Sequence, residues 1–392
     1  MLNVAIVAVT LAVGAALCLP SLARATLWRA TMTPLASIIG SGFLVLGPIL
    51  TVSYGYYAPL VMAALCGVAW LFGGAIRANI AYLAEADPSG RRDRAVETLA
   101  SWVLGSAYVI SVAYYLNLFG AFGLRLTPWD GVGNARVLTT VMFAIILAVG
   151  WTRGFGALER MERLAVGLKL AIIGGLLFGL AVHFTDTAQQ GALVWPAPHL
   201  SGWGALTLAF GLIVTVQGFE TSRYLSSYDA GVRIASMRLA QGIAAAIYMV
   251  YLLLLAYAFD VGQGDLTETA IISMLQVVAP VLSILLVVAA LSAQFSAALA
   301  DTGGAGGLFT ELTGGRIGPR QAYALLVAAG VSLTWVADVF EIISYASRAF
   351  ALYYAVQAWL AGHRAGPGRA RTGYRGLALL GLAMAIFGAP VE

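Results

Sequence analysis

The chain has 392 residues, of which 60% are hydrophobic and 10% are charged, and its formal net charge is +4. Charged residues make up about a quarter of an ordinary soluble protein, so this composition excludes a soluble domain. Apolar runs of about 20 residues, each long enough to cross a bilayer, recur along the whole sequence. We therefore predict an all-α integral membrane protein that lies in the lipid bilayer and has no nucleic-acid partner.

The apolar runs predict about twelve transmembrane helices. In chain order they cover residues 2–20, 33–52, 57–83, 96–124, 137–151, 162–184, 203–225, 234–259, 277–301, 321–336, 341–361 and 374–389. The first run lacks the charged start and the small-residue cleavage site of a signal peptide, so we expect it to be a true span. It gives an extra N-terminal element of residues 1–30, and residues 363–392 hold an additional C-terminal helix.

Most of the 22 basic residues fall in alternate loops between these runs, with clusters at residues 91–94, 160–163 and 369–375. Cytoplasmic loops of membrane proteins collect Lys and Arg, so these loops are predicted to face the cytoplasm and both termini the outside. The sequence thus predicts a multi-pass protein of the plasma membrane. Its net positive charge is explained by the basic residues of the cytoplasmic loops.

The run at residues 33–52 is unusual for a spanning helix because it carries Gly40, Ser41 and Gly42 at its centre and prolines near both ends. Glycine weakens a helix, and unwound backbone at membrane depth occurs only where it is buried in protein or lines a cavity. The pattern indicates either a broken helix that forms a binding site or a face of small residues for helix packing.

A second interruption is predicted in the run at residues 203–225, where Gln217-Gly218-Phe219-Glu220 places an acidic residue in an apolar segment. In the twelve-helix topology the two interrupted helices point in opposite directions. Paired interrupted helices in two inverted halves are typical of transporters. The halves would each hold five helices, residues 31–184 and 203–362, with discontinuous first and sixth core helices.

Residues 39–44 (Ile-Gly-Ser-Gly-Phe-Leu), followed by a Gly-Pro pair, resemble the first-helix signature of the amino acid–polyamine–organocation (APC) superfamily. Residues 217–220 are similar to the break in that superfamily's sixth helix, and residues 160–163 with 166–170 resemble the entry into its fifth helix. The resemblance implies the leucine-transporter-like fold, with ten core helices in two inverted repeats. It says little about the substrate beyond an amino acid or a related small organic solute.

The resemblance also implies a solute site at the two breaks, in which the amides of the first break hold a carboxylate. A helix N-terminus favours an anion, which agrees with this role. Tyrosines of the run at 96–124, including Tyr108, would either cover the pocket or serve as packing. The residues expected to bind the solute are Ser37, Ile39, Gly40, Ser41, Gly42, Tyr108, Gln217, Gly218 and Phe219.

Lys169 is the single lysine of the chain and lies inside the predicted span 162–184. An ionisable residue within a span is a functional candidate by default, and a lysine can release its proton where an arginine cannot. We interpret Lys169 as a proton carrier. The alternative is that its side chain extends to the inner membrane interface.

Sodium-coupled relatives of this fold place two neighbouring hydroxyls on the eighth core helix, facing carbonyls of the first. The matching positions here are Ser296 and Ala297, so one hydroxyl is missing. In proton-coupled relatives a lysine of the fifth helix fills that cation space. The resemblance thus favours proton coupling or exchange without a driving ion. The alternative is a sodium ion bound by the carbonyls of the first core helix and by Ser296. No other metal and no cofactor is expected. The ion-coupling residues are Lys169, Ala36, Ile39, Ala293 and Ser296.

Three further ionisable residues within the spans are candidates for gating, namely Glu220, Asp301 and Arg348. Glu220 and Arg223 are one helical turn apart and are expected to pair. Asp301 ends the predicted span 277–301 beside a glycine-rich segment and would form an inner gate. Arg348 would form an outer-gate ion pair or bind an acidic residue at 338–341.

Together these features predict a secondary active transporter that works by alternating access. We do not expect an enzyme. The histidines lie at span ends or in loops and lack the paired spacing of metal ligands; they are His183, His199 and His363. A membrane sensor or scaffold that borrows the same fold is the remaining alternative. The oligomeric state leaves no signal in the sequence.

Overall fold

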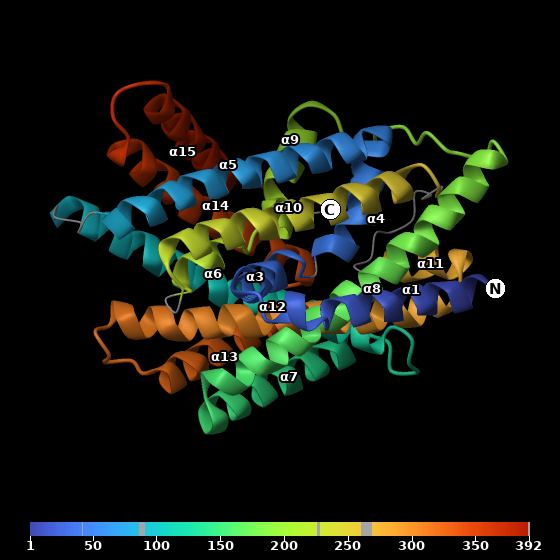
Figure 1. The fold of residues 1–392 in the computed structure, drawn as a ribbon, viewed down its shortest axis with the longest axis horizontal. Helices are drawn as coiled ribbons and strands as arrows, with labels where there is room; N and C mark the ends of the chain where they lie inside the picture. The colour runs from blue at the N-terminus through green and yellow to red at the C-terminus, as the bar shows by residue number, and fades with distance from the viewer. Residues whose placement is uncertain (41, 86–90, 226–227, 260–268, 391–392) are drawn as a thin grey trace.

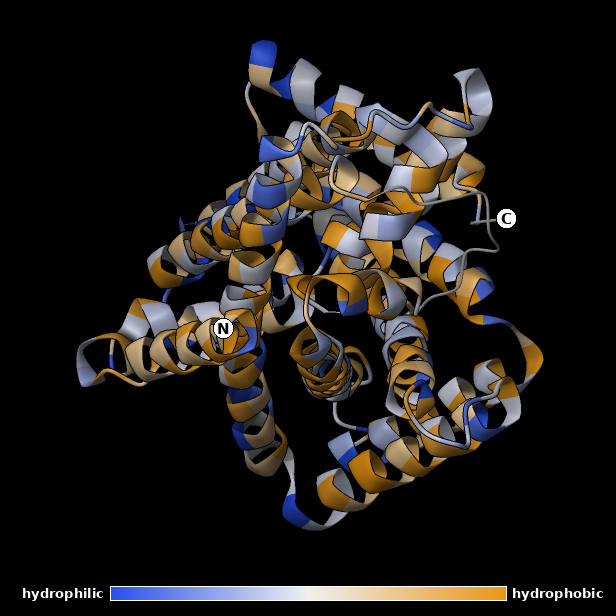
Figure 2. Ribbon diagram, turned by 90° about the vertical axis from the view of Figure 1, so that its right-hand side faces the viewer, coloured by the Kyte–Doolittle hydropathy of each residue, from blue (hydrophilic) through white to orange (hydrophobic). Residues whose placement is uncertain are grey.

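A computed structural model describes residues 1–40, 42–85, 91–225, 228–259 and 269–390, which form helices and contain no β-strand. Hydrophobic residues occur along the helices throughout the bundle (Figure 2). Six stretches are long and apolar enough to cross a membrane: Gly42–Glu85, Arg94–Leu124, Val132–Arg153, Gly156–Gln189, Ala230–Ala256 and Pro280–Leu312. The all-α, multi-pass class is therefore confirmed. Twelve spans were predicted and six stretches meet these criteria, so the count of twelve stays a prediction.

The helical elements follow one another along the chain in this order: α1 (Leu2–Leu17), α2 (Pro20–Ala23), α3 (Thr26–Ile38), α4 (Gly42–Tyr54), η1 (Gly55–Tyr57), α5 (Ala58–Glu85), α6 (Arg91–Leu124), α7 (Val132–Arg153), α8 (Phe155–Gln189), α9 (Gly202–Gly211), η2 (Ile213–Val216), η3 (Phe219–Tyr224), α10 (Ala230–Ala256), α11 (Ala270–Val278), α12 (Pro280–Leu312), α13 (Pro319–Val336), α14 (Val339–Arg364) and α15 (Arg369–Phe387).

Long helices surround short ones in this bundle. The helices α5, α10 and α12 run along the long axis of the molecule, and α3 lies at the centre between α10 and α12 (Figure 1). Helix α12 also packs against α6 and α8, and α14 packs against α6 and α15. The second half of α3 and nearly all of α4 are buried, so the predicted interrupted helix sits in the core.

Each of the twelve predicted runs overlaps helix, but several boundaries were wrong: α3 begins at Thr26 and α8 at Phe155, each seven residues before the predicted start. Helix α11 was not expected, and α12 continues past Asp301 to Leu312. The glycines at 303–307 lie within this helix, and aromatic rings pack onto two of them, Tyr108 onto Gly304 and Tyr323 onto Gly306. Asp301 therefore lies inside a helix instead of at its end.

Arg348 ties the end of the chain to α14. Its Nε and Nη2 donate hydrogen bonds of 3.0 and 2.8 Å to the carbonyl oxygen of Gly388, directly after α15. The acidic partners expected for it, Asp338 and Glu341, instead cap the first turn of α14 and hydrogen-bond each other's backbone N–H groups. The predicted pairing of Arg348 with an acidic residue at 338–341 was thus wrong; among the described residues, the carbonyl at the C-terminus of α15 is its acceptor.

Replacing Arg348 with alanine is expected to lower the free energy of unfolding by about 1.5–3 kcal/mol, because the Gly388 carbonyl loses two charge-assisted hydrogen bonds. Thermal unfolding of the detergent-solubilised protein measures the change. Arg320→Ala, at the exposed start of α13, is the control and should leave the midpoint unchanged. Equal midpoints for the two variants would show that the Arg348 contact contributes nothing to stability.

Candidate functional site

The first interruption separates α3 from α4. Helix α3 ends at Ile38, the backbone of Ile39 leaves helical geometry with φ −82° and ψ 55°, and α4 begins at Gly42. Ser41 lies outside the described residues. The last carbonyls of a helix have no partner within the helix, so other groups must satisfy them.

The second interruption lies between η2 and η3. Gln217 is extended, with φ −82° and ψ 178°, and Gly218 has φ 111°, in the left-handed region that favours glycine. Helix α9 has already ended at Gly211, whose carbonyl accepts a hydrogen bond from the hydroxyl of Ser347 on α14. Both predicted breaks are therefore present as interrupted helices.

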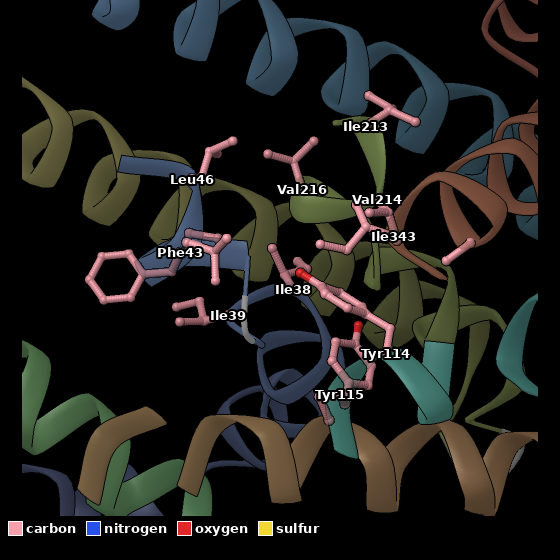
Figure 3. Packing of buried hydrophobic residues seen from close by; sticks show 14 of the residues in the cluster. Ile38, Ile39, Phe43, Leu46, Tyr114, Tyr115, Ile213, Val214, Val216 and Ile343 are labelled. Carbon is pink, nitrogen blue, oxygen red and sulfur yellow. The ribbon is translucent and has the colours of Figure 1, made fainter. Parts of the chain in front are cut away.

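The two interruptions touch each other through main chain. A Cβ on Gly42 would lie 2.7 Å from Cα of Thr215, and a Cβ on Gly218 would lie 2.6 Å from the backbone nitrogen of Ile38. The hydroxyl of Tyr248 on α10 lies 2.6 Å from the carbonyl oxygen of Ile38 and 3.1 Å from that of Thr215, and so bridges the breaks. Figure 3 shows the apolar side chains that pack around this meeting point.

Lys169, on α8, fills the space beside the first break. Its ammonium Nζ donates hydrogen bonds of 2.8 Å to the carbonyl oxygen of Ala36 and 2.6 Å to that of Ile39, and lies 3.1 Å from Oγ of Ser296 on α12. The side chain is 0% exposed, which contradicts the alternative that it extends to the membrane interface. Ser296 in turn donates to the carbonyl of Ala293, so the five predicted ion-coupling residues lie together.

Asp301 approaches the same end of α3 from α12. Its Oδ1 accepts a hydrogen bond of 3.1 Å from the Ser37 hydroxyl, and its Oδ2 contacts the hydroxyl of Ser111 on α6. Ser37 Oγ would lie 2.6 Å from a Cβ on Gly218, so this serine stands between the carboxyl group and the second break.

The remaining candidate solute residues surround the breaks as well. Gln217 donates from Nε2 to the Tyr115 hydroxyl at 2.7 Å, and the Tyr115 ring packs against Gly40. Phe219 stacks on Tyr354 with ring centroids 5.1 Å apart. Tyr108 is fully buried on α6, and its hydroxyl has no hydrogen-bond partner among the described residues.

Among the described residues, side chains fill the place between the breaks where an open central cavity was expected. Two crevices adjoin the breaks, one between α4 and α10 of about 160 Å³ and one between α5 and α10 of about 230 Å³, both touching Tyr248. Side chains such as Tyr115, Gln217 and Tyr248 fill the centre, so a bound solute needs rearrangement of these groups.

Glu220 and Arg223 do not pair with each other, so that prediction was wrong. Glu220 Oε2 accepts hydrogen bonds from the Gly218 N–H at 3.0 Å and from the Tyr354 hydroxyl at 2.8 Å. The 3₁₀ geometry of η3 instead directs Arg223 toward Glu97 on α6 and Gln357 on α14, to both of which it donates.

Arg223 belongs to a buried polar network that the sequence did not reveal. Arg364 forms an ion pair of 2.9 Å with Glu97 and donates to Asn79 Oδ1, and Asn79 Nδ2 donates to Gln357 Oε1 at 2.8 Å. The network joins α5, α6, η3 and α14. Glu97 and Arg364 lie at the ends of apolar runs, where charged residues are common, so no local pattern indicated the network.

Two comparisons place this site among known proteins. The sequence profile of a family described as an APC superfamily transporter matches residues 20–388. A protein of Aquifex aeolicus (strain VF5), described as an uncharacterized protein, is 42% identical over 352 residues, which cover 87% of this chain and 86% of that protein. The matched region includes both interruptions, Lys169 and Asp301. The chain therefore belongs to the APC superfamily of transporters.

Proposed function

We propose that this protein is a secondary active transporter that moves an amino acid or a related small organic solute by alternating access. Membership of a transporter superfamily and the contact between two interrupted segments support the proposal. In this reading the chain spans the plasma membrane twelve times and has the leucine-transporter-like arrangement, with inverted repeats at 31–184 and 203–362. Residues 1–30 and 363–392 lie outside the repeats.

The solute would bind where the two interruptions meet. The first N–H groups of α4, from Gly42 onward, have no partners within the helix and favour a negatively charged group such as a carboxylate. Ser37, Gln217 and Gly218 would complete the pocket once Tyr115 and Tyr248 move aside. Ser41 keeps its predicted role in this pocket on the resemblance alone.

The proposed proton coupling rests on the contacts of the buried Lys169 ammonium group. Its ammonium group donates to two carbonyls of the first break and contacts Ser296, so it connects α8 to α3 and α12. These oxygens are the type of ligand that a hard cation would otherwise bind. When the amine releases its proton it loses both its charge and a donor, and the link weakens. The proton would thereby control the movement of α3.

The buried network around Glu97 would close the cytoplasmic end during transport. It includes residues next to the arginine-rich loops, and Glu97, Arg223 and Arg364 have side-chain exposures of 15%, 9% and 4%. A path to the cytoplasm between α6, η3 and α14 requires these contacts to break. Glu220 and its bond to Tyr354 would form a second barrier nearer the centre.

Lys169→Ala is expected to abolish the response of solute uptake to an imposed proton gradient, with a loss of about tenfold or more, since the amine supplies the titrating link. Uptake of a radiolabelled amino-acid mixture into proteoliposomes, under proton or sodium gradients, measures this response. Arg160→Ala, exposed on the same helix, is the matched control.

An unchanged proton response in Lys169→Ala would contradict the role of the lysine. Uptake that follows a sodium gradient instead would favour the sodium-coupled alternative. Solute binding without any accumulation in vesicles would favour a sensor or scaffold.

Glu97→Gln is expected to open the cytoplasmic end more often, because Arg223 and Arg364 lose their shared carboxylate. A cysteine placed at the buried Ser222, in a background with Cys18 and Cys66 replaced, reports the opening through its rate of maleimide labelling. A loss of 1–2 kcal/mol raises that rate by a factor of about 5–30. Asp130→Asn, which breaks the exposed pair with Arg125, should have no effect. Equal labelling in both variants would refute the gating role.

A further inference from the structure

The crevice between α5 and α10 is open to the surroundings of the bundle. The two helices pack side by side (Figure 1), and each lies in a stretch that is long and apolar enough to cross a membrane. Two half-buried residues, Cys66 of α5 and Ala245 of α10, line the crevice, and the buried ring of Tyr248 lies at its floor. Beside them, a Cβ on Gly67 or Gly242 would meet no atom within 4 Å. The crevice is therefore largely apolar and reachable from the lipid.

A guanidinium group is fixed at the end of this crevice nearest the start of α10, where Gln241 belongs to its lining. Arg77 donates from Nη1 to Gln241 Oε1 at 2.6 Å and from Nη2 to the carbonyl oxygen of Trp70 at 3.3 Å. Its Cζ lies 4.8 Å from the centre of the Trp70 ring. These contacts use two of the five N–H hydrogens of the guanidinium group, so the others are free to donate to a ligand.

The positive charge of Arg77 lies beside a second positive charge. Arg238 of α10 repels it electrostatically, and Tyr374 of α15 also interacts with it. Arg77 is 7% exposed, whereas Arg238 is exposed. Among the described residues, no carboxylate oxygen lies within 4.0 Å of either arginine. Two neighbouring cations, one of them buried, are stabilised by an anion that binds to both.

Both arginines lie at the depth of lipid headgroups. At 1.5 Å per residue, Arg77 is about 29 Å along α5 from its start at Ala58, and Arg238 is about 27 Å along α10 from its end at Ala256. The hydrocarbon core of a bilayer is about 30 Å thick, so both residues reach the same boundary of it. In the proposed topology this boundary is the cytoplasmic one, where basic pockets between helices bind anionic headgroups.

We propose that the crevice between α5 and α10 binds an anionic phospholipid, with the phosphate on Arg77 and Arg238 and one acyl chain in the crevice. Guanidinium groups match phosphate oxygens in geometry and charge, and the acyl chain covers the apolar lining. The chain would reach Tyr248, whose hydroxyl bridges the two breaks. The ligand is a component of the membrane, so the inference goes beyond the proposed transport of a solute.

Other ligands fit this site less well. A free phosphate ion would bind the two arginines but leave the crevice uncovered. A zwitterionic phospholipid would fill the crevice, but its headgroup brings a further positive charge close to Arg77 and Arg238. An anionic phospholipid satisfies both the charge and the apolar surface.

Native mass spectrometry of the purified full-length protein tests the headgroup part of the proposal. The probes are dioleoyl-phosphatidylglycerol and dioleoyl-phosphatidylcholine, which share their acyl chains and differ in net charge. We expect the anionic lipid to bind at least about fivefold more tightly, because each arginine near the surface contributes a factor of about five. Arg238→Gln should reduce this preference about fivefold, and Arg320→Gln, at the exposed start of α13, should leave it unchanged.

A second pair of variants tests the acyl-chain part. Ala245→Phe fills the crevice without altering any charge, and Ala246→Phe, exposed at the next position and outside the lining, is the matched control. We expect Ala245→Phe to weaken binding of the anionic lipid about fourfold for each CH₂ group that is no longer buried. Ala246→Phe should bind like the unmodified protein.

The two cysteines report where the lipid lies. In a Cys18→Ala variant, bound phosphatidylglycerol should slow the reaction of Cys66 with a membrane-permeant maleimide. In a Cys66→Ala variant, the exposed Cys18 should react at the same rate with and without the lipid.

Equal affinity for the two lipids, or equal effects of Arg238→Gln and Arg320→Gln, would overturn the proposal. Competition by inorganic phosphate together with unchanged lipid affinity in Ala245→Phe would show an anion site without an acyl-chain site and would overturn it as well. None of these measurements needs a transported solute, so a failure of solute uptake would refute transport and leave the lipid site standing.

Discussion

The hydrogen bonds between the ammonium group of Lys169 and the carbonyls at the end of α3 are the interaction on which the site depends. Where a helix is broken inside a membrane, its free backbone N–H and C=O groups have no water to hydrogen-bond with, so protein groups must satisfy them. Lys169 does this for Ala36 and Ile39. The lysine thereby makes the interruption of α3 tolerable and ties it to α8 and α12.

The second interruption follows the same constraint with different partners. Tyr248 bridges the carbonyls of Ile38 and Thr215, Ser347 satisfies Gly211, and the carboxyl group of Glu220 accepts from the Gly218 amide. Every one of these groups lies in the buried core. A small change in one of these groups, such as the loss of a proton, therefore alters contacts of two or more helices at once.

The helices and both interruptions could be predicted from the sequence. Each depends on a local feature, the length of an apolar run or the position of its glycines, which can be recognised without knowing any distant contact. Lys169 was recognisable as the one lysine within a span, and the resemblance supplied its neighbours. Long-range partners were not predictable: Arg348 binds a carbonyl of the C-terminal segment and Arg223 binds Glu97, both far away in sequence. The filled centre was missed for the same reason, since Tyr115 and Tyr248 reach it from separate helices.

Nuclear magnetic resonance of protein labelled with ¹⁵N at lysine Nζ tests the central claim most directly, because the chain contains one lysine and gives one side-chain signal. The account predicts an ammonium signal whose hydrogens exchange slowly with water, and which shifts when Ser296 is replaced by alanine. A rapidly exchanging signal like that of free lysine, unaffected by Ser296→Ala, would contradict it.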